Sequence, residues 1–206
     1  MKKILLCTVS LIMIIGMSGC ANNDAAKEEK KDEVDEVKVE KIGKHHIEIV
    51  VKDYGTIKVE LDGDAAPITV ANFMELANNK FYDGLTFHRV IDGFMIQGGD
   101  PKGNGTGGSD KTIKGEFENN DVKNDIEHKR GVISMARSRS MDSASSQFFI
   151  MHQDAVHLDG DYAAFGKVSE GMEVVDAIVA KVKPTDNNGS VVTAEQPIIE
   201  TIKVID

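Results

Sequence analysis

The sequence predicts a mainly β protein, an antiparallel barrel capped by two α-helices. Short runs rich in β-branched and aromatic residues recur along the chain between turn-forming residues, and they outnumber the helical segments. Two segments instead have apolar residues at helical spacing. A chain of 206 residues, 41% of them hydrophobic, is long enough for one well-buried domain. We therefore expect a single folded domain over residues 45–206.

The start of the chain has the composition of a secretory signal. Lys2 and Lys3 precede an apolar run, ILLCTVSLIMIIGM, that is shorter than the roughly 20 residues a helix needs to span a bilayer. The run leads into Ser-Gly-Cys, which resembles the bacterial lipobox, where the cysteine is acylated and the chain is cut before it. We expect residues 1–19 to be a lipoprotein signal peptide and Cys20 to carry lipid. An uncleaved anchor and a plain secretory peptide with an incidental cysteine are the alternatives.

The segment that follows Cys20 is dense in mixed charge and poor in apolar residues. It cannot bury enough surface to fold by itself. Residues 20–44 are therefore predicted to be the lipidated cysteine and a flexible charged tether. Two or three acyl chains would hold the domain stably on the cell membrane, on its extracytoplasmic side.

Eight runs have the pattern of strands, and the first two suit an antiparallel hairpin joined around Asp53. The expected strands are His46–Val51, Gly55–Leu61, Phe87–Ile91, Phe94–Gln97, Gly131–Ala136, Gln147–Met151, Tyr162–Val168 and Ile198–Ile205.

The two expected helices each have one apolar face. The first opens at Ala66-Pro67, where the missing N–H of proline does no harm. Its stripe consists of Val70, Phe73, Met74 and Ala77. The second opens at Gly171, and its apolar residues are Met172, Val175, Ile178, Val179 and Val182.

Composition excludes several functions. A net charge of −10 argues against a nucleic-acid surface, which needs clustered Lys and Arg. The two cysteines, Cys7 and Cys20, precede the domain, so it can form no internal disulfide. The histidines lack metal-site spacing, and no nucleophile with a positioned base can be assembled. We therefore expect no metal and no cofactor.

The stretch from Phe87 to Asp100, FHRVIDGFMIQGGD, is expected to form two short strands that contain unusual polar residues. Arg89 and Gln97 are polar exceptions in an apolar neighbourhood, and burying them unpaired would cost several kcal/mol. Beside Phe94 and Met95 they suggest a pocket with one polar and one apolar wall. On spacing alone, Arg89 could equally be a rim arginine with its head in water, and the two apolar residues could simply be core.

Six sequence motifs favour the pocket over the rim and core alternatives. They are FHRV, GFMIQGGDP, NGTGG, SQFFI, LDG and FGKVSEGMEVVD. Their order and approximate spacing resemble those of cyclophilin-type peptidyl-prolyl isomerases, from about His46 to the C-terminus. The resemblance implies a closed, eight-stranded cyclophilin-like barrel capped by two helices. It also implies an enzyme that accelerates rotation about Xaa-Pro bonds, here in unfolded or newly exported proteins.

The resemblance assigns roles to individual residues. Arg89 matches the position credited with donating to the proline nitrogen, Gln97 would hold a substrate carbonyl, and Phe94 would act with them in the catalytic set. The substrate-binding positions that it implies are Met95, Gly105, Ala136, Gln147, Phe149, His157, Leu158 and Tyr162.

These residue types suit a reaction that breaks no bond. Rotation must overcome about 18–20 kcal/mol of amide resonance, so a catalyst needs only a site that prefers the twisted amide. The proline nitrogen regains its lone pair as the bond twists, and a fixed guanidinium can donate to it. A membrane-tethered module that holds proline peptides without turnover is the alternative function.

Two positions depart from the eukaryotic pattern. His157 replaces the tryptophan that contacts cyclosporin, so weak cyclosporin binding is expected. Tyr162 replaces the family histidine beside the proline pocket and keeps an aromatic wall with a hydroxyl.

Overall fold

The structure, a computed structural model, describes residues 40–206. The predictions for the signal peptide, for Cys20 and for most of the tether lie outside the described residues. The strands are β1 (Lys44–Val51), β2 (Gly55–Asp62), β3 (Phe87–Ile91), β4 (Met95–Gly98), β5 (Val132–Met135), β6 (Phe148–Met151), β7 (Ala164–Glu170) and β8 (Ile199–Val204). The helices are α1 (Pro67–Asn78) and α2 (Met172–Lys181). The mainly β architecture with two helices is confirmed.

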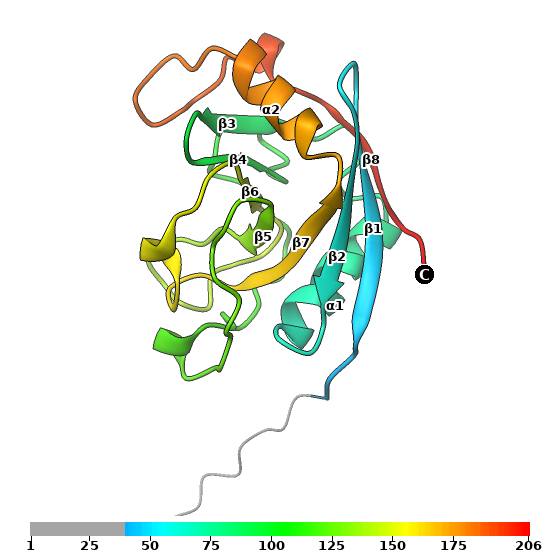
Figure 1. The fold of residues 1–206 in the computed structure, drawn as a ribbon, viewed down its shortest axis with the longest axis vertical. Helices are drawn as coiled ribbons and strands as arrows, with labels where there is room; N and C mark the ends of the chain where they lie inside the picture. The colour runs from blue at the N-terminus through cyan, green and yellow to red at the C-terminus, as the bar shows by residue number, and fades with distance from the viewer. Residues whose placement is uncertain (1–39) are drawn as a thin grey trace, which may run out of the picture. The chain divides into compact units, whose positions relative to one another are not determined.

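The eight strands form one antiparallel sheet in the order β3-β4-β6-β5-β7-β2-β1-β8. Strands β1 and β2 form the predicted hairpin, with Val51 paired to Gly55. The sheet curls strongly, so that β3 and β4 face β1 and β2 across the molecule (Figure 1).

The predicted closed barrel is wrong, because the sheet is an open, curled half-barrel whose edge strands β3 and β8 do not pair as a ladder. The segment before β8 occupies the outer edge of β3 instead. Val90 donates to the carbonyl of Gly189 at 2.8 Å, and Phe87 donates to that of Pro197 at 2.9 Å. A single bridge, Thr86 with Ile198, spans the gap near β8. The backbone groups of β3 are thus satisfied without closure.

The helices lie at opposite ends of the curled sheet (Figure 1). In α1, the buried residues are Thr69, Val70, Phe73 and Ala77, while the predicted Met74 is only partly buried. Ala66 offers no capping side chain, so the Glu116 carboxylate accepts hydrogen bonds from the first turn, including 2.7 Å from Thr69 N–H. In α2, the buried residues are Val174, Val175, Ile178 and Val179.

Two apolar clusters fill the domain. The larger contains a set of aromatic rings in mutual contact: Phe73, Tyr82, Phe87, Phe148 and Phe165. The smaller lies where β4, β5 and β6 meet the chain before β7, and consists of Met95, Val132, Phe149, Met151, Ala155, Leu158 and Ala164. This second cluster underlies the candidate site. Neither helix of residues 40–206 is long and apolar enough to cross a bilayer.

Candidate active site

A cavity of about 960 Å³ opens beside β3, β4 and β6. The segments that face these strands across it contribute Gly103–Gly105, Ala136, His157–Tyr162 and Thr185–Thr193. Ten of the predicted site residues line it: Arg89, Phe94, Met95, Gln97, Gly105, Ala136, Phe149, His157, Leu158 and Tyr162. Gln147 lines an adjoining cavity of about 270 Å³ that shares Gln97 with the first. The structure therefore brings together every site residue predicted within the domain.

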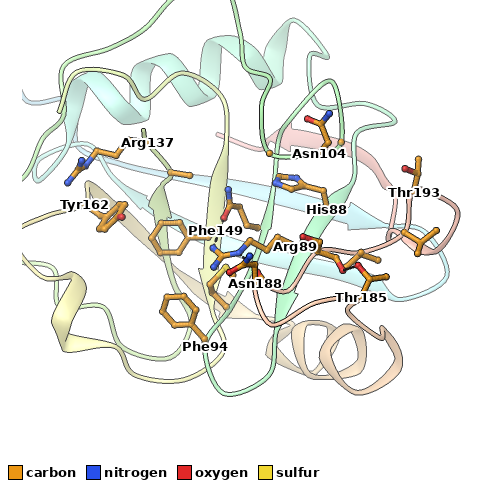
Figure 2. Close-up of a pocket in the computed structure, with 18 of the residues that line it drawn as sticks. His88, Arg89, Phe94, Asn104, Arg137, Phe149, Tyr162, Thr185, Asn188 and Thr193 are labelled. Atoms are coloured by element: carbon orange, nitrogen blue, oxygen red, sulfur yellow. Dashed lines mark hydrogen bonds between the residues drawn. The ribbon is translucent and has the colours of Figure 1, made fainter. Parts of the chain in front are cut away.

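Arg89 lies at the centre of this cavity (Figure 2). Phe94 and Phe149 are on one side of it and His88 on the other, while Tyr162 lies towards one end. A peptide crossing the cavity would therefore meet an aromatic wall and a guanidinium together.

The apolar wall combines strand pairing with burial. Gln97 and Phe149 are paired across β4 and β6, which sets the polar amide beside the aromatic ring. Met95 is 1% exposed and Phe149 is 5% exposed, so these side chains are largely fixed by packing. The Tyr162 ring meets Phe149 edge to face at 5.9 Å between centroids. These packed side chains form a preformed apolar socket in the wall of the cavity.

The guanidinium of Arg89 is held in place by two hydrogen bonds. Its Nε donates to the carbonyl oxygen of Asn188 at 2.6 Å, and its Nη1 donates to Oε1 of Gln97 at 3.1 Å. This contradicts the alternative of a rim arginine with its head in water. Burial lowers the pKa of Arg89, opposed by Tyr162 and Asp186, and the group keeps its charge at neutral pH. Among the described residues, Nη2 has no hydrogen-bond partner, which leaves donors for a ligand.

A chain of amides continues from Arg89 into the adjoining cavity. Gln97 donates from Nε2 to Oε1 of Gln147 at 2.8 Å. Gln147 in turn donates to the carbonyls of Gly105 and Gly107, at 3.2 and 2.7 Å. Each amide is thereby fixed in one orientation, so Gln97 presents a defined face to the cavity.

The glycine-rich loop that contains Gly105 is organised by one buried carboxylate. Asp100 accepts hydrogen bonds from the backbone N–H groups of Lys102, Asn104 and Gly105, at 2.8, 3.1 and 2.6 Å. Burial raises the pKa of Asp100, but these backbone donors outweigh it and hold the pKa below its usual value. The loop is thus fixed along one wall of the cavity.

Some residues that line the cavity were not predicted from the sequence. His88 lines the cavity, is 5% exposed, and neither ring nitrogen has a hydrogen-bond partner in the part of the chain that the structure describes. Burial lowers its pKa, which favours the neutral ring. The loop from Thr185 to Thr193 also lines the cavity. Its Asp, Asn and Gly residues signal a turn, but no local pattern indicates where that turn lies.

Buried Ser134 and His128, together with the partly exposed Asp159, resemble a hydrolase triad. The His128 ring contacts Oδ1 of Asp159 at 2.8 Å and Oγ of Ser134 at 3.0 Å. Ser134 is fully buried, so no substrate carbonyl can reach its hydroxyl. The His128 ring stacks on Phe149 at 6.0 Å, so the group supports the aromatic wall from behind. Residues 40–206 contain no cluster of three or more side chains arranged to hold a metal.

Comparison with known proteins agrees with this geometry. Residues 46–204 match the family described as cyclophilin type peptidyl-prolyl cis-trans isomerase/CLD. Peptidyl-prolyl cis-trans isomerase B of Bacillus subtilis is 52% identical over 124 residues, which are 60% of this chain and 83% of that protein. An isomerase of Helicobacter pylori is 46% identical over 145 residues, 69% of this chain and 86% of that protein.

A solved structure shares the fold. The cyclophilin type isomerase of Cryptosporidium parvum, determined in the presence of the dipeptide Ala-Pro, superposes with a TM-score of 0.68 and 30% identity. The match covers 78% of this chain and 99% of that one. The chain belongs to the cyclophilin type peptidyl-prolyl cis-trans isomerase family. The predicted activity, isomerisation of peptidyl-prolyl bonds, is confirmed at the level of the family.

Proposed function

We propose that Arg89 catalyses Xaa-Pro rotation by binding the twisted amide better than either planar isomer. As the bond twists, the proline nitrogen becomes a hydrogen-bond acceptor, and a guanidinium held on two sides can donate to it at little further ordering cost. A charge-assisted hydrogen bond of this kind contributes about 1.5–3 kcal/mol, or roughly ten- to a hundredfold in rate.

The proline ring of the substrate occupies the apolar socket formed by Phe94, Met95, Phe149 and Leu158. Gln97 holds the substrate carbonyl, while Tyr162 and His157 border the socket. The residues before proline run past Gly105, Ala136 and Gln147, towards the adjoining cavity. Support comes from the way these side chains surround one cavity with Arg89 at its centre.

The main support for this mechanism is that the Arg89 guanidinium is held in place beside a preformed apolar socket. Nuclear magnetic resonance titration with Ala-Pro and Ala-Ala peptides tests it. We expect the Ala-Pro peptide alone to shift the resonances of Phe149 and Met95, and the protein to accelerate its cis-trans exchange. Equal binding of the two peptides would refute a proline socket.

We propose further that residues 1–19 direct export, that Cys20 carries lipid, and that residues 20–44 tether the isomerase domain, 45–206, outside the cytoplasm. The substrates there are proline-containing segments of unfolded exported proteins at the membrane surface. The support is the Ser-Gly-Cys end of the apolar run and the charged composition that follows it. Cys20→Ser should move the protein from the membrane fraction to the soluble fraction. Retention of the variant in the membrane would count against lipidation.

A further inference from the structure

The ring of Phe94 reaches the cavity from a tight turn between β3 and β4. Phe94 N–H donates to the carbonyl of Ile91 at 3.1 Å, and Gly93 has a φ of 73°, which few other residues adopt readily. The Phe94 ring stacks on His157 at 5.9 Å but is only partly buried. Packing alone therefore fixes this ring less firmly than Met95 or Phe149, and the conformation of the turn must set its direction.

His152, which directly follows β6, holds this turn with both its backbone and its side chain. Its N–H donates to the carbonyl of Phe94 at 2.8 Å. Its ring nitrogen Nδ1 accepts a hydrogen bond from the N–H of Gly93 at 3.1 Å. The last two residues of the turn, Gly93 and Phe94, are therefore each bound to the same histidine.

The His152 ring is itself fixed from the opposite side. Its Nε2 lies 3.3 Å from Oδ1 of Asp176 in α2, and Asp176 accepts from Nη2 of Arg130 at 2.8 and 2.7 Å. Arg130 also donates from Nη1 to the carbonyl of His152 at 2.7 Å. Because Nδ1 accepts from Gly93, the ring proton is on Nε2, facing the carboxylate. Asp92, with Oδ1 at 3.5 Å, is the other charged group near Nδ1.

We propose that His152 is a positioning residue of the isomerase, which fixes the Phe94 ring against the substrate proline through the hydrogen bond from Gly93 to Nδ1. His152 does not line the cavity, whereas Phe94 does, so His152 acts on the substrate only through Phe94. The inference rests on the proposed role of Phe94 in the proline socket.

Two substitutions of His152 distinguish the role of its ring nitrogen Nδ1 from that of Nε2. In His152→Asn the amide oxygen can take the place of Nδ1 and accept from Gly93, whereas in His152→Gln the amide lies near the position of Nε2 and leaves Gly93 without an acceptor. We expect His152→Gln and His152→Ala to lower kcat/KM for an Ala-Pro peptide by about three- to tenfold, the effect of one lost positioning hydrogen bond. His152→Asn should stay within about twofold of the wild type. His46→Gln, the same exchange on β1, is the matched control.

A double-mutant cycle with Phe94→Ala tests whether His152 acts through Phe94. If it does, His152→Gln lowers kcat/KM in the wild type but not in the Phe94→Ala protein. Equal losses in both backgrounds, or equal losses in the Asn and Gln variants, would overturn the proposal. If the His152 variants fail these tests while Phe94→Ala is impaired, the proposed proline socket stands and only the positioning role is lost. Full activity of Phe94→Ala would overturn both.

Discussion

The Nε of Arg89 donates to the carbonyl oxygen of Asn188 at 2.6 Å, so the central guanidinium is oriented by a loop that comes almost a hundred residues later. Hydrogen bonds hold this loop close to β3. Asp186 accepts hydrogen bonds from the backbone N–H groups of Asn188 and Ser190, at 2.9 and 3.0 Å, and the carbonyl oxygen of Gly189 accepts one from the N–H of Val90. Catalysis on this account depends on a segment that contains none of the predicted site residues.

Gly189→Val should therefore impair catalysis. Gly189 has a φ of 84°, and an added Cβ would lie 2.7 Å from the carbonyl oxygen of Val90, so the loop must move away from β3. We expect kcat/KM to fall by about three- to tenfold as the Asn188 carbonyl leaves Arg89. Gly84→Ala is the control, because Gly84 has a similar φ of 79° with open space around it. Equal activity losses in the two variants would assign the effect to backbone strain alone.

Stability should fall in mild acid because of His128. Burial lowers the pKa of this ring, opposed by its hydrogen bond to Asp159. Below the ordinary histidine pKa of 6.5 the unfolded chain binds a proton that the folded ring resists, so the free energy of unfolding decreases as pH falls. The contribution is at most about 1.4 kcal/mol per pH unit. Urea unfolding between pH 7.5 and 5.5 should show a shallower pH dependence in His128→Asn, and an unchanged slope would exclude this origin.

His157→Trp should strengthen cyclosporin binding. His157 stacks on Phe94 at the rim of the socket. The family resemblance implies that His157 stands where eukaryotic members have a tryptophan that contacts cyclosporin. A buried tryptophan at an interface commonly contributes about 2 kcal/mol, so the affinity should rise at least about tenfold. Calorimetric titration of both proteins measures this directly. An unchanged affinity would mean that another part of the groove limits binding.

The sequence predicted the strands and much of the site for local reasons. Alternating apolar residues, or continuous apolar runs in the case of β5 and β6, located the strands to within a few residues. The placement of Arg89 and Gln97 in apolar strands indicated a polar wall. When a strand is buried on one face, apolar and polar residues alternate along it, and this alternation is visible without knowing which strands pair with it. The matching motifs then supplied the roles of residues such as Leu158, whose sequence context alone resembles ordinary core.

Features set by distant segments could not be predicted in this way. Whether β3 pairs with β8 depends on the path of the chain around Gly189 and Pro197. The residue pattern within a strand does not indicate that path, so the prediction of a closed barrel was wrong. The contact from Asn188 to Arg89 uses a backbone carbonyl, a group that every residue has. His152 likewise acts through partners on the β3–β4 turn and on α2, so its sequence neighbours give no sign of them.

Arg89→Ala, with rate and binding measured separately, tests whether Arg89 stabilises the twisted amide. We expect the variant to bind an Ala-Pro peptide within about threefold of the wild type, because the socket remains, but to lose at least about tenfold in kcat, because the donor to the twisted nitrogen is gone. Unchanged kcat, or a loss of activity explained wholly by weaker peptide binding, would contradict the assignment of Arg89 to the transition state.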